Sequence, residues 1–249
     1  MAGFRTSSYR FAVGLILAAF LWLGACPPAL AQTQPGDSLT ADENSYGSGA
    51  GLELILTNSG FGLGGYLNRA ISSTTSLIAE TTLSPGKDER EFKFATYFNT
   101  TIPNKAHYFL IMPVQVGVVQ RLFENEIEDN FRPYLQFTAG PAFGWEYPYF
   151  KDCNGNGKYD QGTAVDACTE HTYDALSALP RGHFRMGWGG LAALGAHFGR
   201  STRVTQGVRV GYTFSYFSRK IQLLEPDIEG GSQRYFGTPI ISVSFGRLF

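Results

Sequence analysis

Apolar and polar side chains alternate with a period of two in the C-terminal part of the chain. Over residues 204–216 the even positions are mostly Val, Phe and Tyr, whereas the odd positions are Thr, Gly, Arg and Ser. The segment Gly237–Phe249 repeats this alternation, with Ile241, Val243 and Phe245 in its apolar set. Successive side chains of a strand point to opposite faces, so each segment has one apolar face. Strands of about 14 residues, against a usual 5 or 6, are typical of a tilted crossing of a bilayer.

The same alternation predicts eight strands, each bounded by turn residues. They cover about residues 48–57, 60–70, 74–84, 108–122, 131–147, 183–198, 204–216 and 237–249. Links after the second, fourth and sixth strands are short, whereas long external loops are expected near 85–107, 148–182 and 218–234. Short periplasmic turns and long external loops are typical of outer-membrane barrels. We therefore predict an all-β fold, an eight-stranded antiparallel transmembrane up-and-down β-barrel.

Two alternatives to this fold remain open at the level of sequence. The segment Glu91–Phe98 also has strand character, and we assign it to a hairpin within the second external loop. If it crossed the membrane with a partner, the barrel would have ten strands. A soluble eight-stranded barrel such as a lipocalin is the second alternative, because its charged face would lie outside and its apolar face inside.

The N-terminus has the features of a secretion signal. Arg5 and Arg10 precede an apolar stretch at residues 11–23, and Ala29-Leu30-Ala31 gives a small-x-small cleavage pattern. An alternative is a lipobox at Leu23-Gly24-Ala25-Cys26, in which Cys26 would be acylated. The predicted parts of the chain are a signal peptide (1–31), a polar periplasmic N-terminal segment (32–47) and the outer-membrane barrel (48–249).

Composition and charge agree with an exported barrel. The formal net charge is −1, and removal of residues 1–31, which hold two arginines and no acids, takes it to −3. This balance gives no indication of a nucleic-acid partner. The 30 glycines and the 14% of aromatic residues suit the closely packed strands of a small barrel.

Residues 48–249 resemble the OmpA/OmpX-type small outer-membrane β-barrels. The segment Gly237–Phe249 resembles the signal that the barrel-assembly machinery reads, with Phe245 and Phe249 in the expected places and Arg247 departing from the pattern. The resemblance implies a place in a bacterial outer membrane, with outer-membrane lipid and the assembly machinery as partners. It leaves the activity open, because such barrels include anchors, adhesins and lipid-modifying enzymes.

The third external loop contains a motif with calcium-loop spacing. Counting from Asp152, side chains with oxygen occupy positions 1, 3, 5 and 9, and glycine occupies position 6. This resembles D-x-[DN]-x-[DN]-G loops of the EF-hand, dockerin or thrombospondin-type-3 kind. Position 12 is Thr163 instead of a bidentate acid, which Asp166 or Glu170 would have to replace. The predicted Ca²⁺ ligands are Asp152, Asn154, Asn156, the carbonyl of Lys158, Asp160 and Asp166. The alternative is a polar Asn-Gly turn without metal.

Cys153 and Cys168 flank the same loop and are the two cysteines left after signal removal. In an oxidising envelope such a pair predicts a disulfide, which would stabilise the loop by about 3 kcal/mol through loop-closure entropy. Reactive thiols are the alternative.

Charged residues share the polar face of several strands and are expected inside the barrel. The predicted lumen ion pairs involve Glu53, Glu80, Arg132, Arg185 and Arg209. An eight-stranded interior is only wide enough for side chains, which argues against a general porin. The four histidines lie on different segments without metal-ligand spacing, and the parity of His183 points it inward, away from lipid.

These observations favour a non-enzymatic outer-membrane barrel that displays structured surface loops to an unknown surface ligand. It would be envelope-structural or adhesin-like. The alternatives are a narrow channel or transporter for small or hydrophobic solutes and a lipid-modifying outer-membrane enzyme.

Overall fold

The computed structural model describes residues 48–91, 94–95, 100–123, 131–160, 164–165, 168–198 and 204–248. All of them belong to one compact unit, Asp42–Phe249. The predicted signal peptide (1–31), Cys26, the segment 32–47 and Phe249 lie outside the described residues.

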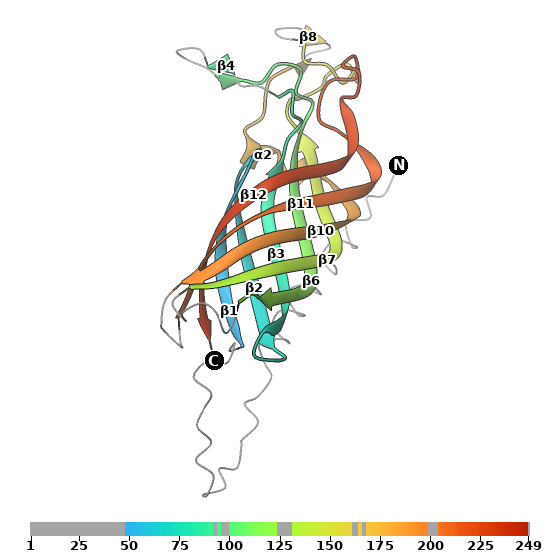
Figure 1. Cartoon of the computed structure of the whole chain (residues 1–249). Coiled ribbons are helices and arrows are strands. Elements are labelled where there is room, and N and C mark those ends of the chain that lie inside the picture. Colours follow the sequence, from blue (N-terminus) through green and yellow to red (C-terminus); the bar gives the residue numbers. More distant parts are fainter. Residues whose placement is uncertain are drawn as a thin grey trace, which may run out of the picture. The chain divides into compact units, whose positions relative to one another are not determined.

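Eight long antiparallel strands close into a barrel (Figure 1). They are β1 (Gly49–Thr57), β2 (Gly60–Ala70), β3 (Thr75–Gly86), β6 (His107–Arg121), β7 (Phe131–Pro148), β10 (His183–Phe198), β11 (Val204–Gln222) and β12 (Ser232–Leu248). Each strand pairs with its neighbours along the chain, and β1 also pairs with β12, from Gly49–Leu248 to Thr57–Ile240. The predicted eight-stranded antiparallel barrel is confirmed, and it is the architecture that the resemblance to OmpA/OmpX-type barrels implies.

The remaining elements are short and lie in the connections. They are β4 (Phe94–Ala95), β5 (Thr100–Thr101), β8 (Ala164–Val165), β9 (Cys168–Thr169), α2 (Ala175–Ala178) and the 3₁₀ helix η1 (Leu179–Arg181). Strand β4 pairs with β5 in a separate two-stranded sheet, so the ten-stranded alternative is wrong. No helix among the described residues has the length and apolar character needed to cross a membrane.

One loop is shorter than predicted. Instead of 218–234, the connection between β11 and β12 covers 223–231, because both strands extend further. The alternation breaks at the polar run Ser218-Arg219-Lys220, whose residues are all exposed. The register shifts between Tyr216 and Ile221, and the ladder then resumes with Ile221–Gln233. At such an irregularity the alternation stops although the strand continues, so a prediction based on alternation places the strand end too early.

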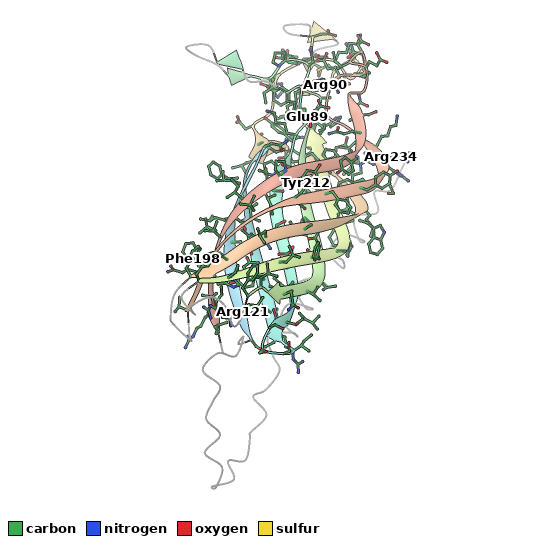
Figure 2. All side chains as sticks on the ribbon, in the orientation of Figure 1. Glu89, Arg90, Arg121, Phe198, Tyr212 and Arg234 are labelled. Carbon is green, nitrogen blue, oxygen red and sulfur yellow. A yellow bond between two sulfur atoms is a disulfide. The ribbon has the colours of Figure 1, made fainter. Side chains whose placement is uncertain are left out.

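The connections divide the barrel into two ends. The end that bears the β3–β6, β7–β10 and β11–β12 connections is called the loop end, and the opposite end, with the β2–β3, β6–β7 and β10–β11 connections, is the turn end. Figure 2 shows Glu89 and Arg90 among the loops, whereas Phe198 and Arg121 lie near the turn end. Gly49 and Leu248 pair at the turn end, where both ends of the barrel sequence meet.

The apolar face of the strands lies outside and the charged face lies inside. Along β11, Val208 and Val210 are 40% and 55% exposed, whereas Arg209 between them is 2% exposed. Leu52 is 72% exposed beside Glu53, which is 5% exposed. This arrangement is the reverse of a soluble barrel, in which the interior is apolar and the exterior is polar.

An ion-pair network fills the middle of the lumen. The Arg209 guanidinium donates to Glu53 Oε2 at 2.5 Å, to Glu80 Oε2 at 2.7 Å and to Ser242 Oγ at 2.9 Å. Glu80 also accepts from Thr138 Oγ1 at 2.7 Å and from Gln136 Nε2 at 3.0 Å. Buried charges are tolerated when they are paired and fully hydrogen-bonded. This central network joins β1, β3, β7, β11 and β12 across the lumen.

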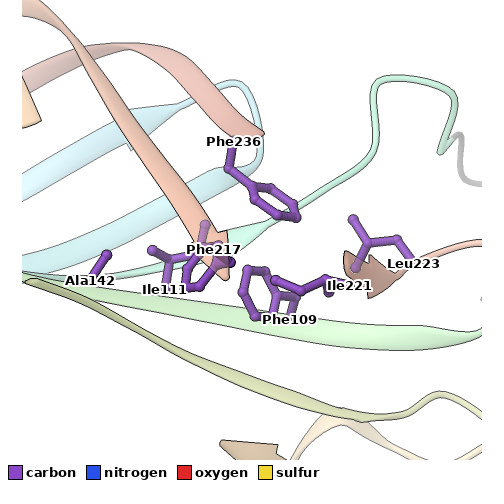
Figure 3. Close-up of a cluster of buried hydrophobic side chains, with 7 residues drawn as sticks. All are labelled: Phe109, Ile111, Ala142, Phe217, Ile221, Leu223 and Phe236. Carbon is purple, nitrogen blue, oxygen red and sulfur yellow. The ribbon is translucent and has the colours of Figure 1, made fainter. Parts of the chain in front are cut away.

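An apolar cluster fills the lumen toward the loop end (Figure 3). Its members are Phe109, Ile111, Ala142, Phe217, Ile221, Leu223 and Phe236. The rings of Phe109 and Phe217 meet edge-on at 5.2 Å between centroids, and Phe236 lies 4.9 Å from Phe109. The irregularity after Tyr216 lets β11 supply both Phe217 and Ile221 to this cluster, and neither residue is accessible to solvent.

We predict that Arg209→Met destabilises the barrel by roughly 3–5 kcal/mol, because Glu53 and Glu80 would remain buried without their cation. Urea unfolding of the vesicle-inserted protein, followed by gel mobility and tryptophan fluorescence, measures the change. The matched control is Arg219→Met on the exposed side of the same strand, where we expect a change within about 0.5 kcal/mol. Equal stability of the two variants would contradict a structural role for the network.

Candidate functional site

The connections at the loop end form one folded body, which we call the loop cap. Its described residues are 87–91, 94–95, 100–106, 149–160, 164–165, 168–182 and 223–231. We name the connection between β3 and β6 the second loop, that between β7 and β10 the third loop, and that between β11 and β12 the fourth loop.

Backbone hydrogen bonds join all three loops. The amide of Ala106 in the second loop donates to the Leu223 carbonyl at 2.8 Å, and Glu225 N donates back to the Asn104 carbonyl at 2.8 Å. On the other side, Tyr149 N of the third loop donates to the Ala106 carbonyl at 2.9 Å. Because these bonds are backbone to backbone, the cap continues the hydrogen bonding of the barrel wall beyond its rim.

Arg90 fixes the second loop to the fourth loop. Its guanidinium donates to the two carboxylate oxygens of Asp88, at 2.8 and 3.0 Å, and to the carbonyls of Glu229 and Gly230, at 2.6 and 2.8 Å. These hydrogen bonds from Arg90 hold the pKa of the Asp88 carboxyl below its usual range. The pair therefore stays ionised at neutral pH, and its contribution to stability is lost as the pH falls through the lowered pKa of Asp88.

Three further contacts hold the cap together. Lys105 and Glu91 form an ion pair in which both side chains are buried. Lys158 of the third loop pairs with Asp227 of the fourth loop, and this hydrogen bond raises the pKa of Lys158. The backbone N–H of the next residue, Tyr159, donates to Glu225 Oε1 at 3.1 Å.

The disulfide Cys153–Cys168 is present in the third loop, with 5.8 Å between the two Cα atoms. Glu170 lies just beyond it and is 3% exposed. Its carboxylate accepts from the backbone N–H of Cys153 at 3.3 Å and from that of Asp160 at 2.7 Å. Glu170 therefore holds both ends of the segment 153–160 from inside the loop.

The calcium-like motif folds through side-chain-to-backbone hydrogen bonds. Asp152 accepts from the backbone N–H groups of Asn154, Gly155 and Gly157, at 3.2, 2.6 and 2.8 Å. Gly157, at the sixth position of the motif, has φ +72°, a conformation that favours glycine. The sharp turn that the motif requires is therefore formed.

Two of the other predicted ligands meet at the carboxylate of a third, Asp160. The side-chain amides of Asn154 and Asn156 both donate to Asp160 Oδ2, at 3.1 and 2.9 Å. Lys158 was predicted to contribute its backbone carbonyl, and its side chain pairs with Asp227. Asp166 and Thr163 lie outside the described residues, within which no group of three His, Cys, Asp or Glu side chains is arranged to hold a metal.

The five charges expected in the lumen occupy three levels. Glu53, Glu80 and Arg209 meet in the central network. Arg185 lies nearer the loop end, where its guanidinium donates to Glu146 Oε2 at 2.7 Å. Arg132 lines a small cavity of about 30 Å³ at the turn end.

Glu146 was missed as a partner in the lumen. It is 4% exposed, and it also accepts from the backbone N–H of Gln222 at 3.0 Å, with His107 Nδ1 3.9 Å away. Its position on the polar face of the fifth predicted strand was the available signal. The pairing itself depends on the cross-strand register, which places Glu146 opposite His183 and beside Arg185.

No family model and no curated protein matches this chain. Among solved structures it is similar to Neisserial surface protein A (NspA), with 10% identity, 81% of this chain and 94% of that chain covered, and a TM-score of 0.39. It is also similar to Ail, the attachment invasion locus protein of Yersinia pestis, with 11% identity, 81% and 97% covered, and a TM-score of 0.37.

We predict that the double variant Cys153→Ser, Cys168→Ser is cleaved at least tenfold faster within the third loop. The lost loop-closure term is about 3 kcal/mol, enough to raise the opened population up to roughly a hundredfold. Limited proteolysis with mass spectrometry of the fragments measures the rate. The control is Thr169→Ala, at an exposed position in the same segment, and it should leave the cleavage rate unchanged. Equal cleavage of the double variant and the wild type would show that the hydrogen bonds alone order the loop.

Proposed function

We propose that the protein is a non-enzymatic outer-membrane β-barrel that displays the loop cap on the cell surface, in an envelope-structural or adhesin-like role. The observation that carries this proposal is the apolar exterior of a closed barrel with charges inside. Large exposed apolar patches mark surfaces that meet a membrane or a partner, and a closed barrel satisfies its backbone hydrogen bonds internally.

The apolar exterior extends around the whole barrel. Its most exposed members include Phe61 at 80%, Leu52 at 72% and Trp188 at 71%. Exposed large apolar side chains occur on every barrel strand, among them Leu54, Leu77, Val116, Phe137, Leu194, Val210 and Ile241. A continuous belt of this kind is what lipid requires of a spanning barrel, whereas an interface with one partner would occupy one side.

The filled lumen favours display over conduction. Around the central network the described residues leave cavities of about 30 and 20 Å³, enough for single waters. The apolar cluster lies between this level and the loop end. A conduit through the lumen would require the Arg209 ion pairs to move. The cap, in contrast, is held by backbone bonds between all its loops, so it presents a fixed surface to the outside.

The orientation is tested by cysteine labelling in intact cells. We expect Ser177→Cys in the loop cap to react with a membrane-impermeant maleimide. The matched variant Ser72→Cys, exposed in the β2–β3 turn, should react only after the outer membrane is permeabilised. Cys153 and Cys168 are already joined in a disulfide and give no background. Labelling of both variants in intact cells, or of neither after permeabilisation, would contradict the proposal.

We also propose that the third loop binds Ca²⁺. Two observations favour it: the left-handed Gly157 at the sixth position, and the approach of Asn154 and Asn156 to Asp160 Oδ2. Rotation of the two amides would turn their oxygens toward the same point as the Asp160 carboxylate, which is the donor set that Ca²⁺ prefers. With Asp152 and Asp160 as the two charged side chains of the motif, attraction for a divalent ion is limited.

We expect calcium to bind with a Kd on the order of 10⁻⁴ to 10⁻³ M, the range of extracellular modules. Asp160→Asn keeps the hydrogen-bond geometry and removes one charge, so it should weaken binding about tenfold. Isothermal titration on the detergent-solubilised protein measures this, with Asp174→Asn, exposed outside the motif, as the control. If calcium changes neither the heat signal nor the protease resistance of the oxidised wild type, the metal proposal fails.

A further inference from the structure

The barrel wall has a lateral opening at the loop end, above the β1–β2 hairpin. Strands β1 and β2 have 9 and 11 residues, whereas β11 and β12 have 19 and 17. The pairing of β1 with β12 ends at Thr57–Ile240, so within the described chain Ser232–Pro239 has no strand on its β1 side. The pairing of β2 with β3 reaches Leu63–Leu83, and beyond it Gly62 and Gly60 still lie against Ser84 and Pro85, so the opening begins above Gly60.

A cavity of about 380 Å³ lies behind this opening, and we call it the lateral cavity. Its lower edge is the hairpin tip, Asn58-Ser59, and its sides come from residues 82–90 and 233–238. The volume is within the range of small-molecule sites. Ile111 and Phe236 of the apolar cluster line this cavity, and no described residue of the third loop does.

The lining of the lateral cavity is polar but has little net charge. Hydroxyl and amide groups come from Ser59, Thr82, Ser84, Thr213, Ser215 and Gln233. The charges at the rim sum to zero, because Lys87 and Arg90 are matched in number by Asp88 and Glu89, and Asp88 is paired with Arg90. Hydroxyl and amide groups of this kind suit a ligand that both donates and accepts hydrogen bonds without carrying a charge.

A buried donor without a partner lies below the cavity. Thr82, Ser84, Pro113 and Thr213 line both the lateral cavity and a smaller one of about 20 Å³ beneath it. Gln115 lines this smaller cavity and is 3% exposed, and its Nε2 has no hydrogen-bond partner among the described residues. An unsatisfied buried donor is costly and is normally met by water or a ligand. An acceptor oxygen placed in the smaller cavity, which adjoins the lateral cavity, would satisfy it.

The level of the opening follows from the unpaired strand edges. Open sheet edges do not occur in the hydrocarbon of a membrane, because their N–H and C=O groups would lack partners. About 9 to 11 residues cross the hydrocarbon, so the 9-residue β1 ends at its upper surface. The exposed Tyr212 and Tyr235 line the cavity, at 45% and 51% exposure, and their hydroxyls lie 3.2 Å apart. Such rings favour headgroup depth.

We propose that the lateral cavity binds the uncharged, hydroxyl-rich headgroup of an amphiphile from the outer leaflet, of the sugar type. The inference rests on the proposed membrane orientation. The headgroup would meet the hydroxyl and amide lining through the opening, and its chain would remain along the apolar exterior beside the β1–β2 hairpin. Leu56 and Phe61, which are 47% and 80% exposed, offer that surface directly below the hairpin tip.

The test uses methyl NMR of the protein in phosphatidylcholine nanodiscs, with isoleucine δ1-methyl labelling. Ile111 reports on the lateral cavity, and Ile241, 50% exposed on the outside, reports on partitioning into lipid. The probes are octyl glucoside, octylphosphocholine and free glucose. We expect octyl glucoside to shift the Ile111 methyl resonance saturably. Half-saturation should need at least tenfold less octyl glucoside than either of the other two probes.

The variant Ser84→Leu, Thr213→Leu removes two lining hydroxyls and adds bulk, so it should weaken the Ile111 response at least tenfold. Thr169→Leu, exposed in the loop cap, is the control. If the double variant is not heat-modifiable on gels, Ser84→Leu alone replaces it.

Equal responses to octyl glucoside and octylphosphocholine, or a response at Ile241 alone, would overturn the proposal. Equal responses to glucose and octyl glucoside would overturn the amphiphile in favour of a free sugar. The labelling of Ser177→Cys tests the orientation independently.

Discussion

The closure of the sheet between β1 and β12 is the constraint on which the rest of the structure depends. The backbone groups at a sheet edge need partners, and the first and last strands supply them to each other from Gly49–Leu248 to Thr57–Ile240. Once the sheet is closed, one face of every strand points into the lumen and the other points outward. The apolar exterior and the charged interior are consequences of this closure.

The alternation made most of the barrel predictable from the sequence. The sixth strand was predicted at 183–198 and found at His183–Phe198, and the inward parity of Arg209 follows from the same pattern. The period-two pattern is strong here because the exterior of the barrel is apolar and its lumen is polar and charged. The upper part of β11 was missed, since Ser218-Arg219-Lys220 interrupts the pattern at the point where the strand leaves the apolar belt.

The site was less predictable, because it depends on contacts between distant segments. The spacing of Asp152, Asn154, Asn156 and Asp160 is local, and it identified the turn at Gly157. The support that Glu170 and Glu225 give to the same loop comes from hydrogen bonds over 10 to 66 residues of sequence separation. The lateral cavity has no sequence signature at all, since it arises from a difference in length between neighbouring strands.

The position of Arg209 has a consequence for how the barrel is built. Its guanidinium joins Glu53 of β1 with Ser242 of β12, which are the first and last strands of the barrel along the chain. A slip of one residue between β1 and β12 would turn Glu53 toward the apolar exterior and leave Arg209 without one of its anions. The central network therefore favours the observed register of the β1–β12 pairing over a shifted one. Only the register that keeps Glu53 in the lumen lets Arg209 pair with both Glu53 and Glu80.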